Sequence, residues 1–344
     1  MVQRDATTIP CDCATHPVED IRRLFVDVDM TERIRAGQRP ARRGAFAKPH
    51  GCAHGTFVVA ATLPHDLKVG VFGHARFPAW VRFSSDTQPP GPDLKKPLGL
   101  AIKLFGVPGE KILETDRAAT THDFIFQNHD VFFVDTATDM CAFTCAGFGP
   151  SYYEAHPATK QIVDAMYSKE VGSVALTDYW SVLPYAFGPG RYAKYKLQPL
   201  GGATDPAVTA AQRVNPNYLH DDLRGRLLKG PVAFAFHVQL RTHPAAMPLD
   251  QATVRWDEAA SPPIHVATLT LPVQDIDAPG QAAYGDNLSF TPWHALPEHA
   301  PVGSIGQARK TVYEASVHLR RTTNGVASGE PSVPWTPPPT HGVS

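Results

Sequence analysis

Proline, which occurs 33 times in 344 residues, constrains the possible folds of this chain more than any other residue type. Its ring fixes φ and removes a backbone donor, so it interrupts helices and is excluded from the centre of a sheet. The prolines concentrate in turns and in the final segment PSVPWTPPPTHGVS. This distribution predicts short strands, long ordered loops, few long helices, and a C-terminal end that is extended over a surface or frayed.

Alternating apolar residues predict several strands. The clearest pattern lies at 97–105, where Leu98, Leu100, Ile102 and Leu104 share one face and Lys103 lies opposite. The other predicted strands are 55–61, 78–85, 123–127 (followed by a second strand or a kinked continuation at 131–135), 192–198, 231–241 and 264–271.

Helical spacing of apolar residues predicts helices at 17–36, 160–169, 174–183, 216–229 and 306–321. The strands fall into two groups, with helices between and after them, and no Gly/Ser linker divides the chain. We therefore expect an α+β fold with an antiparallel β-barrel core and surrounding helices.

Charge and hydropathy exclude two classes of partner. The formal net charge is −1 and no basic stripe is present, so nucleic acid is not an expected partner. No apolar run approaches the ~18 residues that a membrane span needs. The first residues lack the basic-then-apolar pattern of a secretory signal, and we expect a soluble cytoplasmic protein.

Five cysteines are an odd number, which argues against a disulfide framework. Cys11 and Cys13 form a C-x-C pair, and Cys141 and Cys145 have the i, i+4 spacing of a helix. Either pair could bind a metal, but neither is joined in the sequence by a second pair that completes a site. We expect reduced, partly buried thiols for both pairs.

Arg309 and Tyr313 stand four residues apart in ARKTVYEASVHLRR, and on a helix they share a face. A free phenol has a pKa near ~10, but a neighbouring guanidinium favours the ionised form. Tyrosinate supported by arginine is one way to hold haem iron. An Arg–Tyr pair can equally pack and cap a helix, so the remaining sequence has to decide between the two readings.

Five ordered blocks resemble the catalase superfamily, and most of all its short bacterial catalase-related haem proteins. The blocks are RRGAFAKPHGCAHGTF at 42–57, VRFSS at 81–85, KKPLGLAIKLF at 95–105, QNHDVFFVD at 127–135, and NLSFTPWHALPEHAPVGSIGQARKTVYEAS at 287–316. The resemblance covers about residues 20–325. It implies a catalase-like barrel, haem b as the cofactor and Tyr313 as the residue that ligates the iron.

The resemblance also implies roles for residues around the haem. Arg309 would keep Tyr313 ionised, while Arg43, Arg82 and Arg320 would pair with the two haem propionates. On the distal side of the haem, Phe132 would lie over the ring and Ser84 would place a hydroxyl near the distal base.

The chain departs from the family pattern at the distal base. In the family motif R-x-x-H-A-K a histidine lies above the iron, whereas this chain has Arg43-Gly-Ala-Phe46-Ala-Lys48. The distal asparagine position is occupied by Gln127, which keeps an amide on a longer side chain. A phenyl ring cannot accept and return a proton, and loss of such a group costs on the order of 10²–10⁴ in rate.

Three functions remain open from the sequence. The first is a haem enzyme acting on an organic hydroperoxide as a peroxidase, isomerase or lyase, because Phe46 makes the pocket dry and apolar. The second is a catalase or peroxidase for hydrogen peroxide that uses His50, from an alternative alignment of its loop, or Gln127. The third is a protein that binds haem without catalysis.

The resemblance divides the chain into an N-terminal extension (1–19), a catalase-like haem-binding domain (20–325) and a proline-rich tail (326–344). The expected partners are a peroxide or a small apolar organic substrate. The chain lacks the long C-terminal extension of large catalases, and this favours a small assembly such as a homodimer.

Overall fold

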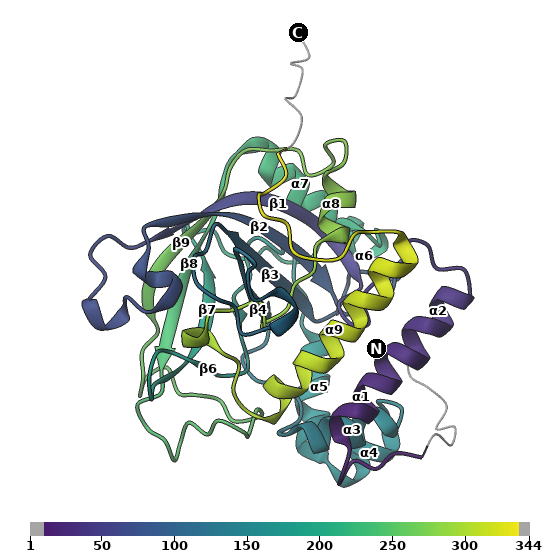
Figure 1. Ribbon diagram of the computed structural model, residues 1–344. Helices are drawn as coiled ribbons and strands as arrows, with labels where there is room; N and C mark the ends of the chain where they lie inside the picture. The colour runs from purple at the N-terminus through teal and green to yellow at the C-terminus, as the bar shows by residue number, and fades with distance from the viewer. Residues whose placement is uncertain (1–9, 337–344) are drawn as a thin grey trace.

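The computed structural model describes residues 10–336, whose strands form one antiparallel sheet (Figure 1). The strand order is β5-β4-β3-β2-β1-β9-β8-β7-β6, and β5 also pairs with β7. That second pairing closes eight strands into a barrel, with β6 attached to β7, and it confirms the predicted fold class. The strands are β1 Lys48–Val59, β2 Arg76–Ser85, β3 Leu98–Phe105, β4 Thr121–Gln127, β5 Tyr179–Trp180, β6 Tyr185–Ala186, β7 Tyr192–Pro199, β8 Val232–Leu240 and β9 Ile264–Leu271.

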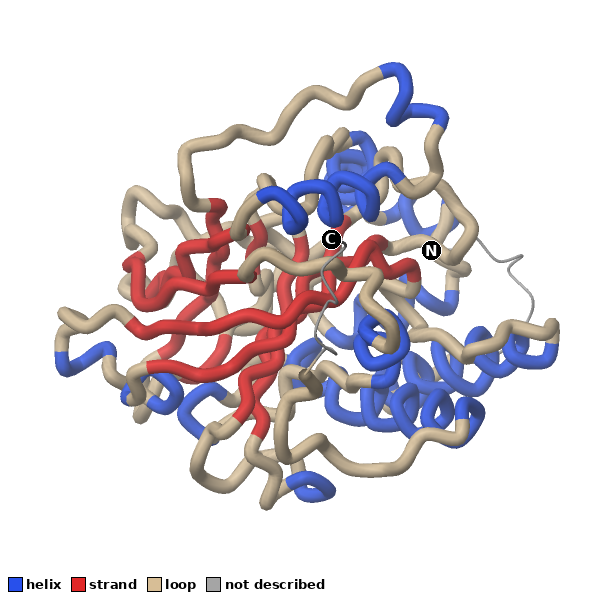
Figure 2. The backbone as a smooth tube through the Cα atoms, turned by 90° about the horizontal axis from the view of Figure 1, so that it is seen from above, coloured by secondary structure: helices blue, strands red, loops and turns tan. Residues whose placement is uncertain are grey.

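Helices gather mainly on one side of the barrel, as the view from above shows (Figure 2). The first three form one uninterrupted helical segment with a π-helical middle: α1 Pro17–Arg22, η1 Arg23–Met30 and α2 Thr31–Arg35. The other α-helices are α3 Ala137–Cys145, α4 Pro150–Ala155, α5 Pro157–Ser168, α6 Ala210–Val214, α7 Tyr218–Lys229, α8 Gln281–Asn287 and α9 Ser304–Asn324. Short 3-10 helices lie at η2 His65–Leu67, η3 Gly70–Gly73, η4 Glu114–Asp116 and η5 Pro297–His299.

The barrel interior is filled by apolar side chains that alternate along the strands. In β3, the predicted row from Leu98 to Leu104 is buried in the main core, together with phenylalanines such as Phe57 and Phe124. The intervening residues of β2, β3 and β4 point out of the barrel toward the helices. One face of these strands therefore stabilises the fold, and the other is available for a site.

Two secondary-structure predictions were wrong. The segment 131–135 is a loop, because the strand at 123–127 ends at Gln127. The segment 174–183, predicted as a helix, contains β5, which pairs with β4 and β7. Its Val, Thr, Tyr and Trp residues favour strands, and closure of the barrel overrides the weak helical spacing.

Helix α9 is held at both ends by side chains from distant segments. At its start, Asp250 Oδ1 accepts hydrogen bonds from the backbone N–H and hydroxyl of Ser304, at 2.6 and 2.7 Å. At its end, the Asn324 amide accepts from Ala41 N at 2.7 Å and donates to Ala41 O at 3.1 Å. The long helix and the loop that begins at Ala41 are thereby fixed relative to each other.

The cysteines correct the expectation of reduced thiols. Cys11 is disulfide-bonded to Cys145, and Cys13 to Cys141, whereas Cys52 is free and buried. The pairing could not be anticipated, since about 130 residues separate the partners and only the fold brings the N-terminal segment against α3. The predicted cytoplasmic location stays a prediction.

The described part of the C-terminal tail is anchored by a buried ionic network on the outer face of the barrel. Glu330 forms ion pairs with Lys103 and Arg321, and Lys103 also pairs with Asp123 at 2.6 Å. His294 lies between Asp123 and Asp116, at 3.0 and 2.9 Å.

Within residues 10–336, every helix is too short or too polar to cross a bilayer. The predicted fraying of the last residues falls at 337–344, outside the described part.

The ionic network predicts a stability that depends on pH. Burial alone would raise the pKa of Glu330, but the positive charges of Lys103 and His294 outweigh it, and the pKa is lowered. Burial alone would lower the pKa of His294, but hydrogen bonds to Asp116 and Asp123 raise it to about 9. Glu330 therefore contributes to the free energy of unfolding above its unfolded pKa of ~4.3, and this contribution is lost in acid. His294 contributes below its unfolded pKa of ~6.5, and this contribution is lost as the pH rises through 9.

At pH 6 we expect Glu330→Gln to lower the free energy of unfolding by about 3 kcal/mol, because it leaves buried Lys103 and His294 with one carboxylate fewer. Urea unfolding of both proteins from pH 3 to 9 measures this, and the difference should shrink toward pH 3. The exposed substitution Glu154→Gln is the control. A constant difference across this range would contradict the role given to the Glu330 charge.

Candidate functional site

A cavity of about 230 Å³ lies between the outer face of the barrel and the helices α1, η1, α3, α5 and α9. Its wall is largely apolar. All nine residues that the sequence singled out line it: Arg43, Phe46, Arg82, Ser84, Gln127, Phe132, Arg309, Tyr313 and Arg320. The structure thus brings the predicted site residues into one cavity, although their individual roles stay predictions.

The strand register builds one wall of the cavity. Ser84 of β2 pairs with Gly99 of β3, and Gly99 pairs with Gln127 of β4, so these three residues form a row across the sheet. The ring of Phe46 lies on Gly99, where an added Cβ would come within 2.7 Å of the Phe46 ring. Glycine is therefore required at this position for the phenyl ring to lie between Ser84 and Gln127.

Phe46 has an unusual backbone conformation that two hydrogen bonds stabilise. Its φ of 49° lies in the left-handed region, which costs a bulky residue of order 1–3 kcal/mol. Two pocket residues stabilise this conformation: Arg82 Nη2 donates to Phe46 O at 3.0 Å, and Phe46 N donates to Asp86 Oδ1 at 3.5 Å. Tyr167 of α5 donates to the other Asp86 oxygen at 2.9 Å.

Helix α9 supplies the opposite wall. Arg309, Tyr313 and Arg320 all line the cavity because they repeat at about one helical turn or its multiples. The Arg309 guanidinium lies 5.9 Å from the centre of the Phe132 ring. The sequence resemblance places these two residues on opposite sides of a haem, whereas in this structure they are in contact.

Three guanidinium groups meet at one end of the cavity; those of Arg82 and Arg320 are buried and that of Arg43 is partly buried. Arg43 Nη2 and Arg320 Nη2 both donate to Leu288 O, at 2.6 and 3.0 Å. The Nε atoms of Arg82 and Arg320 are buried without a hydrogen-bond partner among the described residues. Burial lowers the pKa of Arg43, Arg82 and Arg320, and repulsion by neighbouring arginines lowers it further.

The charge of this arginine cluster is not balanced by the described residues. The nearest carboxylate is Asp286, 4.0 Å from Arg43 Nη1, and it is shared with Arg42 at 3.5 Å. An excess of buried positive charge calls for an anionic ligand. The two propionates of a haem would supply two negative charges, and an apolar macrocycle would suit the rest of the wall, so the residues present fit this group.

No histidine is among the residues that line the cavity in the described part of the chain. His50, the alternative distal base, is fully buried in β1 with Nδ1 3.7 Å from Asp93 Oδ1. Burial lowers its pKa well below the usual value. His50 therefore lies outside the cavity, and the pocket offers Phe46 and Gln127 where the family motif has histidine and asparagine.

Sequence reasoning missed several lining residues. Asp86 directly follows the VRFSS block, and that position was the one available signal for it. Tyr167 comes from α5, and Phe25 and Met30 come from the N-terminal helix, which was predicted as a helix without any link to the pocket. The Nε2 atom of Gln127 is buried without a hydrogen-bond partner in the described part, so its amide is available to a ligand.

Comparisons with known proteins agree with this fold. The chain is 28% identical over 163 residues to a catalase-related peroxidase of Mycolicibacterium paratuberculosis, a match that covers 46% of this chain and 50% of that protein. The chain thus spans about half the length of this curated relative. No family model matches the chain.

Two solved structures have a similar fold. A bacterial catalase superposes with a TM-score of 0.64 at 16% identity, covering 99% of this chain and 70% of the catalase. A fungal catalase superposes with a TM-score of 0.60 at 18% identity, covering 86% of this chain and 61% of the catalase. The fold is therefore that of the catalases. In sequence, 46% of the chain resembles a catalase-related peroxidase.

Gly99→Ala tests the packing of Phe46. The new methyl group would overlap the ring, so we expect a loss of about 1–3 kcal/mol in the free energy of unfolding and a displaced Phe46. Urea denaturation measures the loss, and a crystal structure shows the displacement. Gly225→Ala in α7 is the matched control, because its added methyl meets nothing within 4 Å and favours the helix. Equal effects of the two substitutions would contradict the contact.

Proposed function

We propose that this protein is a haem-dependent enzyme that acts on peroxides, with organic hydroperoxides as its substrates. The observation behind the proposal is the meeting of an unbalanced arginine cluster with Arg309 and Tyr313 in one apolar cavity that no histidine of the described part lines. The sequence relative, itself a catalase-related peroxidase, supports peroxide as the class of substrate. When bound, haem b would supply the iron at which the peroxide O–O bond is cleaved.

The α9 residues would hold the iron from the proximal side. Tyr313 would ligate through its phenolate oxygen, and Arg309, one turn earlier, would stabilise that negative charge. The fixed ends of α9 would keep the phenol in place, because Asp250 holds the start of the helix and Asn324 the end. The rigidity of α9 would matter for this role, since a tyrosine that could move away from the iron would bind it more weakly.

The arginine cluster would bind the propionates. Arg43 and Arg320 already converge on Leu288 O, and the unpartnered Nε atoms of Arg82 and Arg320 offer further donors. Paired hydrogen bonds between guanidinium and carboxylate would remove the repulsion among the three cations. Because Arg82 also donates to Phe46 O, the same residue would connect propionate binding to the wall above the iron.

The distal residues would bind and orient the substrate without taking its proton. Phe46 would exclude water and pack against an apolar chain, while the Gln127 amide would donate a hydrogen bond to a peroxide oxygen. Disproportionation of hydrogen peroxide needs a group that accepts a proton and returns it. A rearrangement of an organic hydroperoxide has no net proton requirement, so this wall suits isomerase or lyase chemistry. A peroxidase reaction is the second candidate reaction for the same substrate.

Tyr313→Phe tests the proposed iron ligand. We expect its haem content after reconstitution to fall several-fold and the spectrum of a phenolate-ligated ferric haem to disappear, because the phenyl ring retains the packing and removes only the oxygen. Titration of the apoprotein with haem, followed by visible absorption, measures both effects. Tyr192→Phe, on β7 and outside the cavity, is the control. Unchanged haem binding by Tyr313→Phe would contradict the assignment.

Phe46→His tests the proposed distal position. If Phe46 stands where a base is needed, the histidine should raise oxygen release from hydrogen peroxide by about 10²–10⁴-fold, and Phe46→Leu should not. The unmodified protein should instead convert a fatty-acid hydroperoxide, which anaerobic mixing and product analysis would reveal. Haem-loaded protein that leaves the hydroperoxide unchanged and releases oxygen rapidly with Phe46 intact would contradict the proposed substrate.

A further inference from the structure

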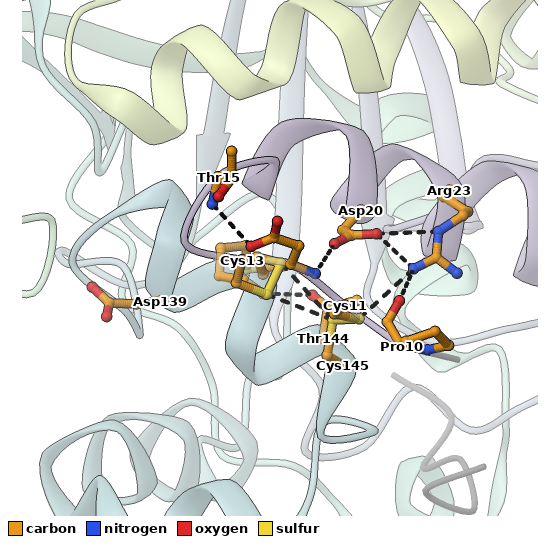
Figure 3. Close-up of a disulfide and its surroundings, with 12 residues drawn as sticks. Pro10, Cys11, Cys13, Thr15, Asp20, Arg23, Asp139, Thr144 and Cys145 are labelled. Atoms are coloured by element: carbon orange, nitrogen blue, oxygen red, sulfur yellow. Dashed lines mark hydrogen bonds and ion pairs between the residues drawn. A yellow bond between two sulfur atoms is a disulfide. The ribbon is translucent and has the colours of Figure 1, made fainter. Parts of the chain in front are cut away.

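Four cysteines, bonded as Cys11–Cys145 and Cys13–Cys141, lie where the N-terminal segment meets α3, and Figure 3 labels three of them. Cys11 and Cys13 come just before α1, and Cys141 and Cys145 lie one turn apart on α3. Cys141 is buried and the other three are half-buried, so small molecules can reach the cluster. The cluster is separate from the haem site, since none of the four lines the cavity.

Two pairs of sulfur atoms that are not bonded to each other are spaced as a tetrahedral metal site requires. Cys13 Sγ is 3.7 Å and Cys141 Sγ is 3.8 Å from Cys145 Sγ. Four thiolates around zinc, with bonds of about 2.3 Å, lie ~3.8 Å apart. The sulfurs of Cys11, Cys13 and Cys145 all fall within 4.8 Å of one another. Opening the two disulfides would therefore leave four thiols in one cluster, with Cys13 and Cys141 each at the required spacing from Cys145.

The surroundings also suit thiolates. Arg23 Nη2 lies 3.8 Å from Cys11 Sγ, and a guanidinium at this distance favours an ionised sulfur. Asp20, which pairs with Arg23 at 2.5 Å, accepts a hydrogen bond from Asp12 N at 2.7 Å and so fixes the C-x-C segment between the two cysteines. The two ligand pairs are thus held by backbone that is already ordered.

We propose that these four cysteines, when reduced, bind one zinc ion as a tetrahedral Cys₄ site, and that the two disulfides are its oxidised, metal-free form. Reduction adds two electrons and two protons to each disulfide. Zinc binding then releases the four thiol protons and forms four Zn–S bonds. In a reducing compartment disulfides do not persist, and clustered cysteines there are more often metal ligands.

The test uses full-length protein as purified. One sample is reduced anaerobically with a phosphine, and a second sample is left oxidised. Each phosphine becomes a phosphine oxide with an oxygen atom from water, while one disulfide becomes two thiols whose protons also come from that water. Both are incubated with zinc chloride and passed through a desalting column. Elemental analysis should find one zinc per chain in the reduced sample and none above background in the oxidised one. Zinc content does not depend on haem or on activity, so failure here would leave the proposed enzymatic function untouched.

Single substitutions locate the zinc. Cys11→Ser and Cys145→Ser should each abolish retention, and both can be purified with the Cys13–Cys141 disulfide intact before reduction. Cys52→Ala, which changes the free buried cysteine, should keep one zinc per chain. Reduced protein with four newly titratable thiols and no zinc would overturn the proposal, as would variants that keep the metal.

Discussion

The period-two alternation of β2, β3 and β4 is the constraint on which the remaining structure depends. The inward residues fill a barrel, so register cannot slip without turning the core outward. That fixed register then sets the outward row of Ser84, Gly99 and Gln127. Phe46 comes from a loop before β1, but its position is set by this row, because Gly99 leaves the space that the ring occupies.

The arginine cluster is the second constraint, and it works against stability in the protein alone. Gathering three guanidinium groups, two of them buried, near one carboxylate costs free energy that packing elsewhere has to offset. A site of this kind is costly unless a ligand completes it. Binding of a dianion would turn repulsion into ion pairing, so the proposed cofactor would be expected to stabilise the fold through the same residues that bind it.

The sequence predicted those parts of the molecule that depend on local pattern. The row from Leu98 to Leu104 and the long helix with Arg309 and Tyr313 have clear periods, and both were found in the structure. The sequence could not predict contacts that arise only when distant segments meet. Tyr167 reaches Asp86 from 81 residues away, and Cys11 reaches Cys145 from 134. For β5, barrel closure and not local spacing decided the structure.

The carboxylate nearest to Phe46 has a structural role that, in the proposed enzyme, would oppose its use as a base. Asp86 accepts hydrogen bonds from Phe46 N and Tyr167, so its carboxylate holds the loop in the conformation that places the ring. Burial and the Asp86 charge raise the pKa of Tyr167, which keeps it a neutral donor. Both hydrogen bonds to Asp86 oxygens therefore contribute to the position of the Phe46 ring. The proposed reaction, which would move oxygen within the substrate, would leave these two hydrogen bonds in place.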